Sequence, residues 1–511
     1  MGTATLMTGS VGGASDRGSV VDHALRAAAL AMPSAEALVI DPGSAGNTLV
    51  WRDLERRTAR LARHLDEVVA ARAGGPCAVE VPAGRSASAL LWLVAALRTA
   101  LPVVLVDPSA PQRERAAVRR ELRGAGLGLV VPAAGDGTVD ERRPPGHLPA
   151  LAGAPPRAAV PPHALVLASG GSTGRPKLVV DTTIRRPAAH EHLQVTSRLA
   201  WRADQTQLVT GRLHHAAPLT FFVRGLVDGN RLVVPSRYAS SIAARLIEEQ
   251  RVRWMQATPF QLQHLAAWLH EHPADLGSLR AVLHMSASCP PSVRRRWIDW
   301  VGAEHVFEIY GATEGLGLTV ASGAEWLARP GTVGRGFYTR IRILDEAMRP
   351  VPRRAVGTVF LRSLGTPPTA VYLGGDARLA TSPDGFGSVG DRGRLDEDGY
   401  LYLEPRRVDM INVAGENVYP AEVEAVLVGC PGIMDAAVTG VADDRLGARP
   451  VAVVTCWPGV TLDERAVLAY CRDRLSAFKT PLWIRVVDRI PVTPAGKVDR
   501  RGVADLVSGF G

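Results

Sequence analysis

Apolar residues recur along this chain in two alternating patterns, one with helical spacing and one of short continuous runs. Leu54, Leu61, Leu65 and Val68 follow helical spacing, and apolar runs such as residues 77–81 are typical of buried strands. The patterns predict helices over residues 52–71, 86–100, 111–123, 242–250, 259–269 and 291–300, and strands over residues 77–81, 102–107, 127–131, 164–168, 252–256, 281–284 and 306–310. Such alternation predicts a mostly parallel sheet with helices on both faces.

Other stretches of the chain differ from this alternation. Residues 1–20 are rich in Gly and Ser, and residues 133–162, rich in Pro and Gly, predict a long loop or linker. Residues 330–405 predict a strand-rich β subdomain. We therefore expect an α/β protein whose large N-terminal domain, residues 1–407, has doubly wound sheets plus that β subdomain. A small α+β domain on a hinge follows over residues 408–511, with a helix near 462–475, and no internal repeat is visible.

Composition excludes several classes of protein. Charged residues make up 21% of the 511 residues and hydrophobic residues 46%, which excludes wholesale disorder and a coiled-coil rod. Every apolar stretch of roughly 18 residues contains a charge, so no membrane span is predicted. The N-terminus lacks a basic region followed by an apolar run, so no secretory signal is expected. The five cysteines are scattered without a CxxC pair, and the chain is predicted to be cytoplasmic.

The basic residues are spread over the whole chain. The net charge of +9 is interleaved with acidic residues, and aromatic residues make up only 5%. That distribution argues against a nucleic-acid interface and fits an anionic small molecule. Only three of the 59 basic residues are lysines: Lys177, Lys479 and Lys497. An ammonium enters narrow sites as a point charge where a guanidinium does not fit, so these three positions are candidates for function.

A loop rich in Gly, Ser and Thr follows the predicted strand over residues 164–168. It reads Ser169, Gly170, Gly171, Ser172, Thr173, Gly174, Arg175, Pro176, Lys177. Glycines allow a close backbone wrap, and the amide and hydroxyl groups suit phosphate oxygens. The loop lacks the Gly-Lys-Ser/Thr ending of a Walker A loop, so it predicts another kind of phosphate loop, with a flexible surface loop as the alternative.

The loop resembles a signature of the adenylate-forming superfamily, which contains acyl- and aryl-CoA synthetases, adenylation domains of peptide synthetases, and luciferases. Four further segments resemble the superfamily's motifs, in its order and at its separations. They are residues 308–314 (Glu-Ile-Tyr-Gly-Ala-Thr-Glu), residues 389–391 with 398–401, residues 406–424, and residues 494–500 around Lys497. All three lysines lie in matched segments, Lys479 within residues 478–481.

The resemblance implies a two-step reaction. A carboxylate attacks the α-phosphate of ATP and pyrophosphate leaves, and a nucleophile then displaces AMP from the acyl-adenylate. It implies a nucleotide site built from the loop residues and Lys177, with Ser288, Tyr310, Gly311, Asp391 and Arg406. Tyr310 would stack on adenine, while Asp391 and Arg406 would contact the ribose.

The same resemblance implies which residues carry the chemistry. Thr313 would reach the α-phosphate, and Glu314 would bind Mg²⁺, a hard cation that prefers oxygen ligands. Lys497 would bridge the substrate carboxylate and the α-phosphate, where two anions must meet. His215 would border the carboxyl end of the acid, although a core or capping histidine is nearly as plausible.

The acid and its acceptor are expected to contact a further set of residues. It comprises His214, Phe221, Phe222, Gly225, Gly315, Ala414, Gly415 and Lys479. Small and aromatic residues together predict a flat or bulky apolar acid. Lys479 is balanced between a structural role and a contact to the acceptor.

Two departures from the family pattern concern the second step. Val408 replaces a polar hinge residue, and Ala414 replaces a glycine in the loop that lines the CoA tunnel in relatives. The leading expectation is an acid–CoA ligase that uses ATP, Mg²⁺ and CoA. The alternative is an amide synthetase with an amine acceptor, and the third is loading of a carrier-protein thiol, with no carrier domain expected in this chain. The protein is expected to be a monomer or homodimer.

Overall fold

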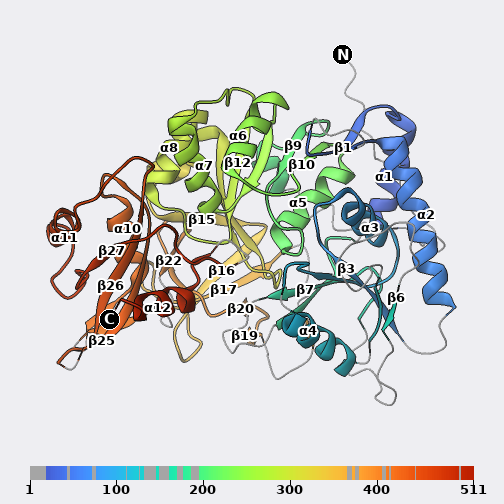
Figure 1. Cartoon of the computed structure of the whole chain (residues 1–511). Coiled ribbons are helices and arrows are strands. Elements are labelled where there is room, and N and C mark those ends of the chain that lie inside the picture. Colours follow the sequence, from blue (N-terminus) through green and yellow to red (C-terminus); the bar gives the residue numbers. More distant parts are fainter. Residues whose placement is uncertain are drawn as a thin grey trace.

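The computed structural model describes residues 19–510 apart from several segments. These gaps are 43–46, 72–75, 111, 126, 132–145, 149–159, 170–176, 186–194, 365–370, 374–378, 405–409, 414–415, 444 and 494–496. Figure 1 shows a large N-terminal part built on two sheets and a smaller C-terminal part beside it. Within the described residues, each helix is too short or too polar to cross a membrane.

Fifteen strands form one large sheet, here called sheet A. Its centre is parallel, in the order β13, β12, β11, β9, β10, β1, and its flanks are antiparallel. The central strands are β13 (Val306–Gly311), β12 (Ala281–Met285), β11 (Trp254–Ala257), β9 (Thr206–Val209), β10 (Arg231–Val234) and β1 (Glu36–Ile40). The carboxyl ends of parallel strands meet at one edge, where ligands bind in open α/β sheets.

A second sheet of seven strands, here called sheet B, is parallel through β5, β3, β4 and β7. Its order is β18 (Val371–Leu373), β8 (Lys177–Asp181), β7 (Leu165–Ser169), β4 (Val103–Val106), β3 (Cys77–Pro82), β5 (Gly128–Val131) and β6 (Gly146–Leu148). The β6 strand lies within the segment expected to be a linker, and it pairs antiparallel with β5.

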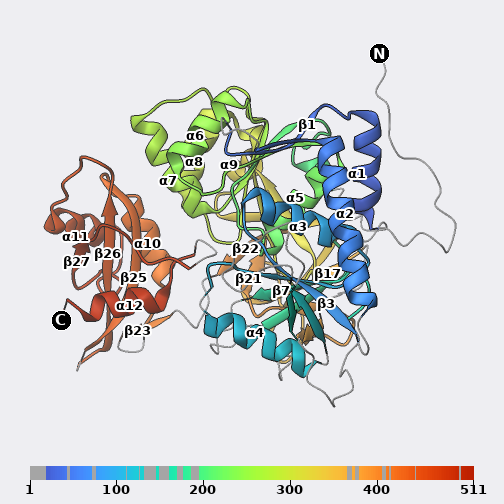
Figure 2. The ribbon, with the colours of Figure 1, turned by 45° about the vertical axis from the view of Figure 1, so that its right-hand side comes forward.

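Helices separate the two sheets and cover their outer faces. Apolar side chains of both sheets share one core with α1 (Val20–Ala31), α2 (Trp51–Ala70), α3 (Ala87–Arg98) and α5 (Ala216–Val227). A second core joins the other face of sheet A to α6 (Ser240–Glu249), α7 (Pro259–Glu271) and α8 (Pro291–Val301). The polar helix α4 (Gln112–Gly124) covers the outer face of sheet B. This layering confirms the α/β fold class, and Figure 2 shows the layers from a second side.

The segment over residues 330–405, expected as a β subdomain, is strand-rich. Most of its strands extend sheet A: β15 (Thr332–Phe337), β16 (Thr339–Leu344), β17 (Gly357–Ser363), β19 (Ala380–Thr381), β20 (Gly387–Ser388), β21 (Arg392–Leu395) and β22 (Tyr400–Glu404). They join it through β14 (Leu318–Ser322), and β2 (Thr48–Val50) forms the opposite edge. The exception is β18, which pairs with β8 of sheet B.

The C-terminal part has its own core and a three-stranded sheet of β25 (Ile433–Asp443), β26 (Gly447–Cys456) and β27 (Ile484–Val486). The short pair β23 (Ile411–Val413) and β24 (Glu416–Val418) leads into α10 (Pro420–Val428), followed later by α11 (Glu464–Arg472) and α12 (Arg500–Ser508). A separate small α+β domain is therefore confirmed. Its predicted boundary at residue 407 lies outside the described residues and stays a prediction.

The C-terminal domain rests against α7 and α8. The Gln263 amide donates to the carbonyl of Met434, and the Trp457 ring lies 4.8 Å below the Arg296 guanidinium. Burial raises the pKa of the neighbouring Asp435 to about 6, and the nearby Glu424 raises it further, against hydrogen bonds from Ala436 and Gln263. Asp435 is therefore a titratable group at the contact between the domains.

We expect Asp435→Asn to stabilise the protein at neutral pH. Because the pKa is higher in the folded than in the unfolded chain, the folded state binds more protons between pH 3.8 and 6, and stability falls as pH rises through that window. The amide lacks the charged form, so the gain should be on the order of 1 kcal/mol at pH 7.5 and vanish near pH 4. Thermal melting at both pH values measures it. An equal gain at both, or the same effect in the exposed Asp488→Asn, would contradict the assignment.

Candidate active site

The predicted adenine and ribose residues meet at the carboxyl end of β13. Tyr310 lies near the end of that strand, and Asp391 follows β20 and precedes β21, 81 residues further along the chain. The Tyr310 hydroxyl donates a hydrogen bond of 2.9 Å to Oδ2 of Asp391. Sheet A thus brings together an aromatic ring and a carboxylate, groups that suit a base and ribose hydroxyls.

The loop after β13 carries Thr313 and Glu314, both half-buried. Gly315 has a φ of +65°, a left-handed conformation that favours glycine, and Gly311 lies so close to the Gly317 carbonyl that an added Cβ would approach it to 3.3 Å. Ser288 is exposed in the loop after β12, where Ser286 has a φ of +80°. Their predicted contacts to nucleotide and acid stay predictions.

Glu314 is held by a residue that the sequence analysis missed. The Tyr372 hydroxyl donates a hydrogen bond of 2.8 Å to Oε1 of Glu314, and the Lys177 ammonium lies 5.6 Å from the centre of the Tyr372 ring. Burial and the adjacent Glu314 carboxylate raise the pKa of Tyr372 above its usual value, so the phenol keeps its proton. Tyr372 stands in β18 outside every recognised motif, and only the pairing of β18 with β8 brings it here.

The predicted phosphate loop connects two antiparallel strands. Ser169 ends β7 and pairs with Lys177, the first residue of β8. The paired strands β7 and β8, here called the phosphate hairpin, therefore hold the two ends of the loop side by side. A strand follows it, unlike the helix that follows a Walker A loop. Residues 170–176, with Gly170, Gly171, Ser172, Thr173 and Gly174, lie outside the described residues, and so does Arg406.

A polar network joins the two sheets beside the predicted acid site. Asp107, which follows β4 of sheet B, accepts from Arg212 at 3.1 Å and lies 3.7 Å from Nε2 of His214, both on the loop between β9 and α5. The rings of His214 and His215 lie 4.2 Å apart. Burial and the neighbouring His215 lower the pKa of His214 to about 4, so this histidine is neutral at physiological pH.

The predicted acid-contacting residues on α5 occupy different environments. Phe221 is 4% exposed and packs in an aromatic cluster with Trp201 and Trp254, whose ring centres lie 6.0 and 4.8 Å from its own. Phe222 is fully buried in the core between the sheets, and Gly225 packs so closely that an added Cβ would lie 2.4 Å from Oε1 of Gln207. The structure gives Phe222 and Gly225 packing roles, and their predicted contact with the acid stays a prediction.

The two lysines of the C-terminal domain, Lys479 and Lys497, have different surroundings. Lys479 forms an ion pair of 2.6 Å with Glu422 on α10, which supports the structural alternative for this residue. Lys497 is exposed in a turn just before α12, where its carbonyl accepts from the Thr493 amide at 2.7 Å. Ala414 and Gly415 lie outside the described residues.

The described residues fit a magnesium ion held jointly with phosphate. They contain no group of three or more His, Cys, Asp and Glu side chains that could hold a metal alone. Magnesium is commonly bound by one or two carboxylates plus substrate phosphates. Glu314 offers such a carboxylate beside the Lys177 end of the phosphate hairpin, with Oε1 already hydrogen-bonded and fixed.

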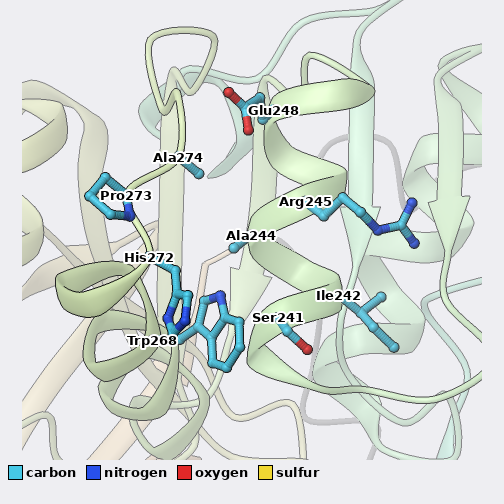
Figure 3. Close-up of a pocket in the computed structure, with 9 residues that line it drawn as sticks. All are labelled: Ser241, Ile242, Ala244, Arg245, Glu248, Trp268, His272, Pro273 and Ala274. Carbon is cyan, nitrogen blue, oxygen red and sulfur yellow. The ribbon is translucent and has the colours of Figure 1, made fainter.

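The pocket in Figure 3 is separate from these residues. It measures about 380 Å³ and lies between α6 and the end of α7, where the rings of Trp268 and His272 stack 4.0 Å apart. None of the predicted site residues lines it. The chemistry is therefore assigned to the edge of the sheets and not to this pocket.

Three features together are typical of an adenylate-forming enzyme. At the edge of the parallel part of sheet A, Tyr310 is hydrogen-bonded to Asp391. Glu314 lies near the phosphate hairpin, and a separate α+β domain follows. Comparison with known proteins agrees. The family model described as AMP-binding enzyme matches residues 25–367, and the AMP-binding enzyme C-terminal domain matches residues 422–497. The chain belongs to this family and is an ATP-dependent, AMP-forming carboxylic acid ligase.

One curated relative and two solved structures show which proteins this chain resembles. A feruloyl-CoA synthase of Amycolatopsis sp is 33% identical over 338 residues, covering 65% of this chain and 68% of that protein. The o-succinylbenzoate CoA synthetase of Bacillus subtilis, solved with its acyl-adenylate, has a TM-score of 0.74 at 22% identity, covering 94% and 97% of the two chains. The amide bond synthetase McbA of Marinactinospora thermotolerans has a TM-score of 0.67 at 24% identity, covering 95% and 99%. Both structures share the fold.

Proposed function

We propose that this enzyme activates a bulky apolar or aromatic carboxylic acid as its acyl-adenylate and transfers the acyl group to the thiol of CoA. The observation that carries the proposal is the meeting of Tyr310 with Asp391 and of Glu314 with Lys177 through Tyr372, four predicted nucleotide residues from distant parts of the chain. The similarity to a feruloyl-CoA synthase supports both the aromatic acid and the CoA acceptor.

In the first step, residues of the chain orient and neutralise the reacting groups. Tyr310 stacks on the adenine and Asp391 binds the ribose hydroxyls, so that the α-phosphate is placed near Thr313. Glu314 would hold Mg²⁺, which would neutralise phosphate charge, and Lys177 adds a second cation. Lys497 contacts the carboxylate and the α-phosphate together. A carboxylate oxygen then bonds to the α-phosphorus as the bond to the pyrophosphate oxygen breaks, and electrostatic stabilisation accounts for most of the acceleration.

In the second step, the CoA sulfur bonds to the acyl carbon and AMP leaves. Phe221 lies on α5, the helix that follows the two histidines, and its ring packs with those of Trp201 and Trp254. This aromatic packing supports an apolar acid. Within the proposal the protein is a cytoplasmic monomer or homodimer. None of the five cysteines, all of them among the described residues, forms a disulfide, which supports a reducing compartment.

One assay tests the proposal. Purified protein receives ATP, Mg²⁺ and a panel of aromatic, aliphatic and short dicarboxylic acids, and pyrophosphate release is measured. CoA or an amine panel is added next, and the products are weighed by mass spectrometry. We expect aromatic acids to release pyrophosphate fastest, acyl-CoA to form, and EDTA to abolish release. Preference for short dicarboxylic acids would overturn the acid class, and amides in place of thioesters would favour the amide synthetase.

A further inference from the structure

Tyr372 contacts two predicted groups of opposite charge with different parts of one side chain. Its hydroxyl donates to Oε1 of Glu314, and the face of its ring meets the Lys177 ammonium. Glu314 belongs to the loop after β13 of sheet A, whereas Lys177 opens β8 of sheet B. Tyr372 is therefore a direct connection between the metal side and the phosphate side of the site.

The backbone of Tyr372 is fixed independently of Glu314. Tyr372 pairs with Val179 and Leu373 pairs with Leu178, so β18 forms the edge of sheet B next to β8. Leu373 is 4% exposed and packs in the core of sheet B, which anchors the strand. The phenol therefore projects from a strand that is paired with the arm of the phosphate hairpin itself, and the distance from this arm to Glu314 is set by one rigid aromatic side chain.

Carboxylates that bind metal ions are commonly hydrogen-bonded themselves, and the hydrogen bond orients them. The Tyr372 hydroxyl donates a hydrogen bond to Oε1 of Glu314, and Oε2 of the same carboxylate is the oxygen that can bind a metal ion. Hydrogen-bond partners behind a metal ligand orient it, and their loss typically costs about 10–100-fold in metal affinity or activity. The aromatic face next to Lys177 supplies a cation–π contact that positions the ammonium as well.

We propose that Tyr372 is a positioning residue that orients Glu314 for the Mg²⁺ of MgATP and aligns it with Lys177 at the phosphate hairpin. The inference rests on the proposed function, because Mg²⁺ at Glu314 is part of that function. The tyrosine does not touch the reacting atoms and acts through the carboxylate. Its loss should therefore affect the metal requirement more than the acid or the acceptor.

The test compares Tyr372→Phe with the wild type. Phenylalanine keeps the ring beside Lys177 and removes only the hydroxyl. Binding of a non-hydrolysable ATP analogue is titrated by calorimetry at a series of Mg²⁺ concentrations, and acid-dependent pyrophosphate exchange is measured over the same series. We expect the Mg²⁺ concentration at half-saturation to rise by about 10-fold in both measurements, while the KM for the acid stays within about twofold. An unchanged Mg²⁺ midpoint would overturn the proposal.

Two further variants separate metal positioning from folding. Tyr402→Phe removes a similar bond, from a phenol to Oδ2 of Asp396 at 3.3 Å, away from the site, and it should leave the Mg²⁺ midpoint unchanged. In a Glu314→Gln background the Tyr372→Phe change should no longer shift the midpoint, whereas a folding defect would persist there. If the wild type binds MgATP and yet releases no pyrophosphate with any acid, the proposed function fails. If the wild type is active and Tyr372→Phe keeps its midpoint, only the role of Tyr372 fails.

Discussion

Lys497→Ala is expected to lower the rate of acyl-adenylate formation by about 10²–10³-fold, the usual cost of removing one donor that stabilises developing charge. Two anions meet in this step, and an ammonium on a flexible stem can contact both oxygens as charge moves between them. The turn before α12 presents Lys497 at the surface of the C-terminal domain. We propose that the C-terminal domain carries this lysine to the nucleotide for adenylation, so its contribution should be confined to the first step.

Two assays of the same variant test this separation. Pyrophosphate exchange reports the first step, and thioester formation from synthetic acyl-adenylate and CoA reports the second, which Lys497→Ala should largely spare. Arg485→Ala serves as a charge-matched control, because its ion pair with Glu464 lies on the surface of the same domain. Equal losses in both steps would contradict a lysine that acts only in adenylation. A loss in Arg485→Ala as well would indicate a general effect of removing positive charge.

The scarcity of lysine pointed to three positions, whose surroundings differ. Lys177 lies beside Tyr372 at the end of the phosphate hairpin, and its predicted contact with phosphate stays a prediction. Lys479 forms a 2.6 Å ion pair with Glu422, a contact that an arginine could also make. The rarity of a residue type can therefore identify candidate positions, but the side chains that each candidate contacts determine its role.

Local periodicity predicted helices α2, α3, α4, α6, α7 and α8 and strands β3, β4, β5, β7, β11, β12 and β13 to within a few residues, because those elements depend on spacing along the chain. It did not predict strands β1, β9 and β10 of sheet A. For example, the helix expected over residues 259–269 is α7 (Pro259–Glu271), which begins with a capping box between Thr258 and Gln261. Strand partners were not predictable in the same way. Within residues 330–405 the strands extend sheet A apart from β18, which pairs in sheet B, because pairing depends on contacts between residues far apart in sequence.

The difference between local spacing and long-range pairing also explains which site residues could be predicted. Tyr310, Glu314 and Asp391 lie in recognisable motifs, since their roles depend on short segments with particular turns. Tyr372 and Asp107 lie in no such motif, and each gains its role from a partner on the other sheet, Glu314 in one case and Arg212 in the other. Residues that connect two sheets leave no periodic or local pattern in the sequence, so only the assembled fold identifies them.

Asp391→Ala is expected to raise the ATP concentration needed for half-maximal adenylation by about 10–10²-fold. Hydrogen bonds to a charged group contribute about 1.5–3 kcal/mol each, and the carboxylate can accept from the ribose hydroxyls. The change also removes an acceptor of the Tyr310 hydroxyl, so the ring that we propose stacks on adenine loses a hydrogen bond that holds it.

The contribution of that anchor can be separated from the contact to ribose. Tyr310→Phe keeps the aromatic ring and the carboxylate and removes the hydroxyl that donates the 2.9 Å bond between them. If Asp391 acts mainly on the ribose, Tyr310→Phe should raise the ATP requirement less than about threefold, and a 2′,3′-dideoxy ATP analogue should bind wild type and Asp391→Ala almost equally. If the analogue still discriminates between them by 10-fold, or if ATP dependence is unchanged in Asp391→Ala, the carboxylate serves to hold Tyr310 and its ribose role is wrong. The two outcomes differ because only the first one requires the sugar hydroxyls.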